Sequence, residues 1–388
     1  MHKKHKSNLR SVYHSLGMVV SAAAVVLMTT GAQGQNVFVS EYGTGNLYEF
    51  TPAGQRSIFA FWPPWSGPDG LAFDNSGNLF VAGSSPGNIY ELTPDGQQSI
   101  FASGLYYGSG LAFDSAGNLF AADFSGNIYK FDPGRTKTLF ASGLVNPQGL
   151  VFDKPGNLFV SSYTTGEIYK FTPGGTRTTF ASGLSGPLGL AFNSFGDLLV
   201  AAEDSGEILR FTPEGTRTTF ASGLLYPIGL DFDSVGNLFV SDLGRGNIYE
   251  FTPSGTRSTF ATGLYYNTFL AIRPPDTIPP RVLAISATPD LLWPPNHRMV
   301  PVNVAVNAVD NRDPSPTAEI TQVTCNEPQG RFAPDWAITG PLSVDLRAER
   351  LGRNNRIYTI YVDVTDSSGN KTTTNTTVTV PESRSGLH

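Results

Sequence analysis

The sequence predicts an all-β protein with two folded parts, a large domain built from repeats and a smaller β-sandwich. Two observations support this fold class. One phrase, as in "LAFDSAGNLFAADFSGNIYKF" at residues 111–131, recurs along most of the chain, and the composition changes after a proline-rich stretch that begins at residue 273. Repeats of one short unit are stacked side by side in known folds, so the phrase should correspond to one structural unit.

Each copy of the phrase contains four short strand patterns. The first strand opens on a leucine, the second on a G-N-L-F pattern, the third on I-Y, and the fourth ends in F-A. The opening leucines follow one another at steps of 39 or 40 residues, at Leu71, Leu111, Leu150, Leu190, Leu230 and Leu270. A period near 40 with four strands per unit is typical of a β-propeller.

The turns between these strands have suitable residues. A D-x-x-G-N turn joins the first two strands, as from Asp114 to Asn118, where Gly117 can adopt the positive φ of a tight hairpin. A T-P-x-G turn joins the last two strands, as from Thr212 to Gly215. Proline presets φ at the second position of such a turn.

The two ends of the repeat region complement each other. The first copy has no opening strand and starts directly at Asn36, whereas the last copy supplies only the opening strand at 270–272. We therefore predict a six-bladed propeller over residues 35–272, closed by pairing of the chain's two ends, which removes exposed sheet edges.

The motifs P-x-G-L-A-F-D, G-N-L-F-V and G-N-I-Y over residues 36–272 resemble those of NHL-repeat propellers and of the related gluconolactonase/senescence-marker and streptogramin-lyase groups. In gluconolactonase-like proteins, the residue before the strand-one glycine contributes to a divalent-metal site in several blades. The equivalent residues in this chain are Asp69, Ser109, Gln148, Leu188, Ile228 and Thr268. One carboxylate, one amide and two apolar residues do not make that cage, so we assign no metal ligands and leave Ca²⁺ or another divalent cation open as a cofactor.

The resemblance to streptogramin lyases implies a histidine proton carrier on the channel face. The predicted propeller contains no histidine, which argues against that chemistry and against a Ser-His-Asp arrangement. Acidic residues do follow the second strands, and we expect them to make hydrogen bonds at the blade ends. They are Glu41, Asp123, Glu203, Asp204 and Asp242.

Large aromatic residues occupy the loops that enter the first strands. The longest of these loops, "FWPPWSGPDG", contains two tryptophans. Aromatic faces on one rim are typical of a binding surface, although some of them could instead fill the channel mouth or pack on the second domain. The predicted ligand-binding residues are Trp62, Trp65, Asp69, Tyr106, Tyr107, Gln148, Tyr226, Tyr265 and Tyr266.

The first 34 residues read as a secretory signal peptide, with a basic start, an apolar run from 17 to 28 and small residues at 32 and 34. Its removal lowers the formal charge from −6 to −10, because four basic residues and no acid are lost. We therefore expect a secreted, periplasmic or cell-surface monomer with no membrane span and no nucleic-acid partner. The single cysteine, Cys325, is expected to be a small buried thiol in a strand.

A short proline-rich linker, residues 273–281, precedes a predicted β-sandwich at 282–388. The D-T-x-P-P opening and the late "VDVTDSSGNKTTTNTTVTV" resemble bacterial Ig-like and hyalin-repeat modules. Several residues there offer oxygen ligands of the kind calcium prefers, namely Asp310, Asn311, Asp313, Asp363 and Asp366. A simpler interpretation of 366–370 is a hairpin turn with Gly369 at the strained position.

The leading functional hypothesis is a non-catalytic binding module that recognises an extracellular glycan or protein through the aromatic loops. One alternative is an enzyme, a lactone hydrolase with a divalent cation near Asp69 and Gln148. A second alternative is a structural envelope protein that uses the propeller only as a scaffold.

Overall fold

The computed structural model describes residues 34–64, 67–329, 334–352 and 354–382, and all regular elements in these ranges are strands. Most of the predicted signal peptide, residues 1–33, lies outside the described residues. No helix in the described part of the chain is long and apolar enough to cross a bilayer.

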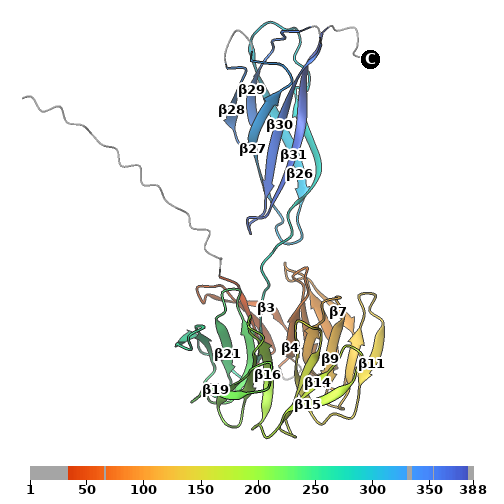
Figure 1. Cartoon of the computed structure of the whole chain (residues 1–388), viewed down its shortest axis with the longest axis vertical. Coiled ribbons are helices and arrows are strands. Elements are labelled where there is room, and N and C mark those ends of the chain that lie inside the picture. Colours follow the sequence, from red (N-terminus) through yellow and green to blue (C-terminus); the bar gives the residue numbers. More distant parts are fainter. Residues whose placement is uncertain (1–33, 65–66, 330–333, 353, 383–388) are drawn as a thin grey trace, which may run out of the picture. The chain divides into compact units, whose positions relative to one another are not determined.

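Six four-stranded antiparallel sheets form the blades of the predicted propeller (Figure 1). Each blade begins with its inner strand and ends with its outer strand. Blade 1 contains β24 (Asn267–Ile272), β1 (Val37–Glu41), β2 (Asn46–Phe50) and β3 (Arg56–Phe61). Blade 2 contains β4 (Pro68–Phe73), β5 (Leu79–Gly83), β6 (Ile89–Leu92) and β7 (Gln98–Ala102). Blade 3 contains β8 (Gly108–Phe113), β9 (Leu119–Asp123), β10 (Ile128–Phe131) and β11 (Lys137–Ala141).

The remaining three blades repeat the same order. Blade 4 contains β12 (Pro147–Phe152), β13 (Leu158–Ser162), β14 (Glu167–Phe171) and β15 (Arg177–Ala181). Blade 5 contains β16 (Pro187–Phe192), β17 (Leu198–Ala202), β18 (Glu207–Phe211) and β19 (Arg217–Ala221). Blade 6 contains β20 (Pro227–Phe232), β21 (Leu238–Asp242), β22 (Asn247–Phe251) and β23 (Arg257–Ala261).

The ring closes as the sequence predicts. The last propeller strand, β24, pairs with the first, β1, so that Val37 lies opposite Ile272 and Phe38 opposite Ala271. The inner strand β24 also contacts the inner strands of both neighbouring blades, β20 and β4. The all-β class and the six-bladed architecture with end-to-end closure are therefore confirmed.

Apolar side chains between adjacent blades hold the ring together. A phenylalanine of one second strand meets a phenylalanine at the end of the next first strand edge to face, as Phe80 meets Phe113 at 4.9 Å between ring centroids. The same contact recurs in the next pair of blades, where Phe120 lies 5.0 Å from Phe152. Such pairs contribute about 0.5–1.5 kcal/mol each beyond the area they bury. The repeated phrase thus encodes a repeated contact between blades.

The glycine of each first strand allows neighbouring inner strands to approach one another closely. A Cβ built on Gly110 would lie 2.0 Å from the carbonyl oxygen of Gln148, and one on Gly149 would lie 2.3 Å from that of Leu188. No real Cβ contact is so short, so this position in the P-x-G-L motif requires a residue without a side chain.

Seven further strands form two sheets in the C-terminal part. One sheet has the order β25 (Arg281–Thr288), β26 (Met299–Val309), β29 (Ser343–Arg347) and β28 (Trp336–Gly340). The other has the order β27 (Thr317–Cys325), β30 (Arg356–Thr365) and β31 (Lys371–Val380). Both sheets contribute to one hydrophobic core, which includes Val302 and Val344 from the first sheet and Ile360 and Val362 from the second. The Ig-like identity of these sheets stays a prediction.

One C-terminal strand, β28, has a weak signal in the sequence. Three of its five residues are exposed, and it lies between Pro334 and Pro341. Its sequence, WAITG, is too short to show a clear period of two, and it ends on a glycine.

Candidate functional site

Two positions in each blade meet at one end of the propeller, and we call this set of positions the rim. The first position directly precedes the inner strand, and the second directly follows the next strand outward. A backbone hydrogen bond joins the two, as from the amide of Leu243 to the carbonyl of Tyr226 at 3.1 Å. The six pairs, from blade 1 to blade 6, are Tyr266 with Tyr42, Gly67 with Ser84, Tyr107 with Phe124, Asn146 with Tyr163, Gly186 with Glu203, and Tyr226 with Leu243.

The first rim position has a left-handed backbone in most blades. The φ angle is 51° at Tyr107, 48° at Asn146, 61° at Gly186, 61° at Tyr226 and 54° at Tyr266. The fold itself sets this conformation, since it recurs whatever residue is present. Glycine adopts it without strain, whereas other L-residues lose roughly 1–2 kcal/mol there.

Burial of the side chain does not offset the backbone strain of the three tyrosines at this position. Tyr107 is 44% exposed, Tyr226 45% and Tyr266 44%. Two more tyrosines precede them directly in the chain and are exposed further, Tyr106 at 61% and Tyr265 at 55%. The structure thus brings five of the predicted ligand-binding residues to one rim and leaves their rings accessible.

Neighbouring rings on the rim support one another. Tyr106 and Tyr107 meet edge to face at 5.1 Å, and Tyr265 and Tyr266 do so at 4.9 Å. Tyr107 also stacks on Phe124 at 6.2 Å with an angle of 23° between the rings. Phe124, which is 46% exposed, was missed by the sequence analysis. Comparing the residue after each second strand across the blades would have found it.

The two tryptophans of the long loop differ from this pattern. Trp62 is 7% exposed and packs on Tyr90 at 5.3 Å. Its amide donates to the carbonyl of Gly45, just as the amide of Leu105 donates to Gly87 in the next blade. Trp62 therefore occupies the place of a core leucine and does not present its ring on the rim. Trp65 lies outside the described residues.

Asp69 and Gln148 lie deeper than the rim, at the start of the inner strands. Burial among the inner strands raises the pKa of Asp69 to about 7, and a hydrogen bond with the Thr268 side chain partly offsets this rise. Asp69 nevertheless keeps some solvent exposure. Gln148 is buried and donates to Asn146 Oδ1 at 2.6 Å.

Three of the acids after the second strands have the structural role that the sequence analysis expected. Asp123 is 1% exposed and accepts hydrogen bonds from the amides of Tyr106, Ser125 and Asn127. Asp242 accepts from the amide of Leu225, and Glu41 from the amide of Tyr265. These buried carboxylates fix the loops that carry the rim tyrosines.

Glu203 and Asp204 behave differently, because Ala202 occupies the structural position in their blade. The Tyr163 hydroxyl donates to Asp204 Oδ1 at 3.2 Å and also bonds to Glu203. Burial raises the pKa of Glu203, and burial together with the two carboxylates raises the pKa of Tyr163 to about 12. This acidic group gives one side of the rim a polar, negatively charged character.

The opposite end of the propeller holds a cavity of about 600 Å³, lined by the opening leucines of the blades and by Pro274 and Pro275. Asp231 also lines it, and burial raises the pKa of this carboxyl to about 6. Both oxygens of Asp231 accept backbone amides, from Phe232 at 2.8 Å and Ile272 at 2.7 Å. This end repeats the same residue types in each blade, whereas the rim differs from blade to blade.

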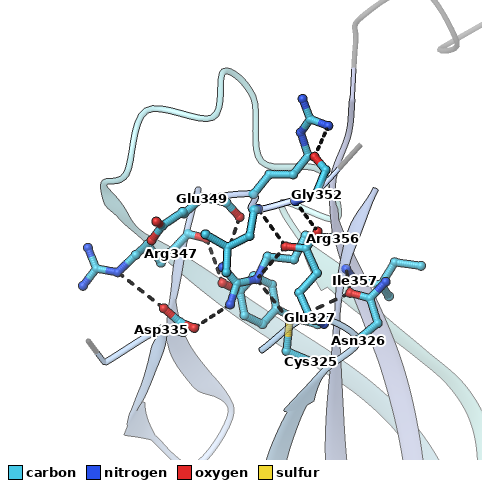
Figure 2. Close-up of polar contacts among 12 residues, drawn as sticks. Cys325, Asn326, Glu327, Asp335, Arg347, Glu349, Gly352, Arg356 and Ile357 are labelled. Atoms are coloured by element: carbon cyan, nitrogen blue, oxygen red, sulfur yellow. Dashed lines mark hydrogen bonds and ion pairs between the residues drawn. The ribbon is translucent and has the colours of Figure 1, made fainter. Parts of the chain in front are cut away.

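A buried polar network lies among the C-terminal strands (Figure 2). Arg356 is fully buried, forms an ion pair with Asp335, and donates from Nε to Cys325 Sγ at 3.1 Å. Its Nη1 donates to the carbonyl of Glu349 at 3.3 Å. Cys325 is thus partly buried at the end of β27 with an arginine beside it, a more polar place than the sequence analysis expected. Buried pairs of this kind specify packing and are lost at high cost when one partner is removed.

Known structures share the propeller fold. A chain in the crystal structure of a nidogen/laminin complex is 22% identical, with 62% of this chain and 98% of that chain covered and a TM-score of 0.56. A protein of unknown function from Bacteroides caccae is 18% identical, with 62% and 99% covered and a TM-score of 0.52. A streptogramin B lyase is 12% identical, with 64% and 92% covered and a TM-score of 0.51.

No protein-family model matches the sequence, and no curated protein matches it. At these identities the structural likeness shows the fold alone. The similar propellers include a chain of the nidogen/laminin complex and a lyase, so the fold does not determine the function. The function has to be argued from the site.

Proposed function

We propose that the propeller is an extracellular binding module that takes a glycan or a protein segment on the aromatic rim. The observation that supports this most directly is the strained backbone at Tyr107, Tyr226 and Tyr266. Glycine adopts this backbone conformation without strain, and Gly186 shows that the fold accepts it. These tyrosines have a strained backbone, and their side chains are about half exposed. This combination supports a role in binding a ligand rather than in stabilising the fold.

The rim has suitable chemistry for a carbohydrate chain. Tyrosine faces bury the apolar C–H surface of a sugar ring, and their hydroxyls hydrogen-bond with sugar hydroxyls. The rings lie in loops of several blades, so a ligand would contact more than one of them. A tyrosine-rich surface also suits protein ligands, since rigid aromatic side chains lose little entropy on binding. The export predicted from residues 1–34 would place the rim in contact with either ligand class.

The test is a glycan array and a pull-down with the protein spanning residues 35–388. The informative variant replaces Tyr107, Tyr226 and Tyr266 by glycine, which leaves the backbone conformation favourable. Binding should fall at least tenfold while the fold is retained. The matched control is Phe195→Ala, which removes an aromatic ring that is 82% exposed on the opposite end of the propeller.

The result would also assign the ligand class. Binding on the array supports a glycan, and binding only in the pull-down supports a protein. If the triple variant binds as well as the wild type, or if the control loses binding equally, the rim is not the site.

A lactone hydrolase remains the second candidate, because Asp69 has a pKa of about 7 in the channel and could exchange a proton at neutral pH. Within the described ranges, the only group of three acidic, histidine or cysteine ligands close enough to hold a metal lies outside the propeller. Two results would favour the hydrolase. The wild type would turn over lactones only with a divalent cation present, and Asp69→Asn would lose this turnover.

A further inference from the structure

Three carboxylates meet where the propeller's connecting segment reaches the C-terminal sheets. Asp276 belongs to the segment after β24, Asp310 directly follows β26, and Asp366 directly follows β30. One carboxylate oxygen from each lies within 4.8 Å of the others. Residues far apart in the sequence therefore place three negative charges in one small volume.

No basic side chain forms an ion pair with any of these three acids within the described part of the chain. The ion pairs of the C-terminal sheets use other acids, such as Asp335 and Asp363. The nearest arginine in sequence, Arg312, directs its Nη1 to the carbonyl of Pro274 at 2.6 Å instead. Three carboxylates at this separation repel one another strongly, because partial burial weakens the screening by water.

A separate observation concerns the hydrogen bonds of Asp310. Its Oδ1 accepts the amides of Arg312 at 2.9 Å and Asp313 at 2.8 Å. Its Oδ2 is buried and accepts no hydrogen bond from any described residue. A buried carboxylate oxygen without a partner is costly, and such groups are usually satisfied by a ligand, water or ion.

The surroundings of the cluster hold it in place. Asp366 is only 5% exposed and is fixed by the amides of Ser368 and Asn370. The Asn370 side chain bridges two of the acids, since its Nδ2 donates to Asp366 Oδ2 at 2.8 Å and to the carbonyl of Asp276 at 3.0 Å. The cluster is therefore a preformed group of oxygen donors.

We propose that Asp276, Asp310 and Asp366 bind a calcium ion that fastens the connecting segment to the C-terminal sheets. The three ligand groups are carboxylates, which suit a hard cation such as Ca²⁺, and this group of described residues includes no histidine or cysteine that would favour zinc. Three carboxylates supply three to six of the six to eight oxygens that calcium takes, and water completes the shell. This site is independent of the rim and of the ligand proposed for it.

The other acids named in the sequence analysis have different partners. Asp363 pairs with Lys371 at 3.6 Å, and Asp313 accepts the amides of Ser315 and Ser367. Asp276, which the sequence analysis did not include, replaces them because the connecting segment folds back against the turn at 366–370.

The test uses the protein spanning residues 35–388 after treatment with EDTA. Calorimetric titration with Ca²⁺ should show one site, with Kd on the order of 10⁻⁴ to 10⁻³ M as in extracellular modules. Saturating Ca²⁺ should raise the Tm of one unfolding transition by roughly 4 °C or more. Mg²⁺ at the same concentration should give a smaller shift, because it demands a tighter octahedral site.

Asp310→Asn gives the decisive comparison, since asparagine keeps the oxygen that accepts the two amides and removes the charge. We expect Kd to rise at least tenfold and the Ca²⁺-dependent shift to disappear. In EDTA the same variant should be as stable as the wild type or more so, because the repulsion is relieved. A purely structural aspartate would instead lose stability equally with and without Ca²⁺.

The matched control is Asp290→Asn, an exposed acid of the same C-terminal part outside the cluster, which should keep the full response. If Asp310→Asn does not fold, Asp276→Asn tests the same prediction from the connecting segment. Absence of Ca²⁺ heat and of any Tm shift in the wild type would overturn the proposal, as would an unchanged response in both cluster variants.

Discussion

The two ends of the propeller are built from the same repeat but are organised in different ways. At one end the D-x-x-G-N turns satisfy their own polar groups, as when Asp114 accepts the Asn118 amide at 2.9 Å and its side-chain nitrogen at 2.7 Å. At the rim the equivalent loops differ from blade to blade, and three of them hold a tyrosine in a strained backbone. The residues of the turn end stabilise the fold, whereas several residues of the rim carry backbone strain that reduces its stability.

Blade 5 shows how strongly the turn end is maintained. Its turn begins with Asn193 and ends with Asp197, so the two residue types have exchanged places. The side-chain hydrogen bond is kept in the reverse sense, with Asn193 Nδ2 donating to Asp197 Oδ2 at 3.0 Å. The exchanged acid also pairs with Arg210. The side-chain hydrogen bond across the turn is therefore preserved although the two residue types are exchanged.

The largest effect is expected where a glycine is required by space. In Gly110→Ala the new Cβ would meet the Gln148 carbonyl at 2.0 Å, so the inner strands must separate. We expect a loss of about 3 kcal/mol or more in the free energy of unfolding. Gly117→Ala, in the turn, has its nearest atom at 3.9 Å and a φ of 80°, so its cost should be about 1 kcal/mol.

Chemical denaturation of both variants would measure the difference. Similar losses at the two glycines would mean that the inner strands are more loosely packed than the structure indicates.

The next prediction separates two kinds of acid on the rim. Asp123→Ala leaves the amides of Tyr106, Ser125 and Asn127 without their acceptor and should cost about 2–3 kcal/mol. Glu203→Ala removes a carboxylate whose pKa is raised by burial, so its ionised form is already disfavoured in the fold. Its unfolding free energy should change by less than about 0.5 kcal/mol. Equal losses in the two variants would contradict this division.

A smaller effect depends on pH. The pKa of Asp69 is raised from 3.8 to about 7, so the folded state binds this proton more tightly than the unfolded state. Between these pKa values stability therefore falls as pH rises, and below pH 3.8 the group contributes no difference. A shift of about three pKa units would correspond to about 4 kcal/mol. Because the Asp69 side chain keeps some solvent exposure, we expect Asp69→Asn to gain about 2 kcal/mol over the wild type as the pH rises from 4 to 8. If the denaturation midpoints of the wild type and of Asp69→Asn change with pH in the same way over this range, the pKa of Asp69 is not raised by burial.

The sequence was sufficient for the architecture because every blade repeats the same constraints. Leucines, turn glycines and D-x-x-G-N pairs recur at one spacing, so register, turns and ring closure could be predicted. The site was only partly predictable. Trp62 was expected on the rim, but it fills a core position equivalent to Leu105, since a two-residue loop insertion shifts the alignment there.

Contacts between distant segments could not be predicted in the same way. The pairing of Tyr163 with Asp204 joins two blades, and the approach of Asp276 to Asp310 and Asp366 joins a linker to two separate turns. No spacing in the sequence marks either contact. Both depend on how whole elements pack, which local patterns do not specify.

The smallest effect is also the most direct test of the contrast between the two ends. Tyr226 holds a φ of 61° with its ring 45% exposed, so the fold gains little from the side chain and loses by the strain. Relief of this strain in Tyr226→Gly should favour the folded state by about 1 kcal/mol, an unusual sign for removal of an aromatic residue. Glycine's greater freedom in the unfolded chain opposes this gain by roughly 0.4–1 kcal/mol, so the net change should lie between zero and a modest stabilisation.

Tyr249→Ala is the matched control, because that tyrosine packs in the core between blades 5 and 6 and its removal should destabilise by about 3 kcal/mol. A clear loss of stability in Tyr226→Gly would show that the ring serves the fold. In that case the strain at the rim would no longer be an argument for a ligand, and the aromatic residues there would have to be explained by packing alone.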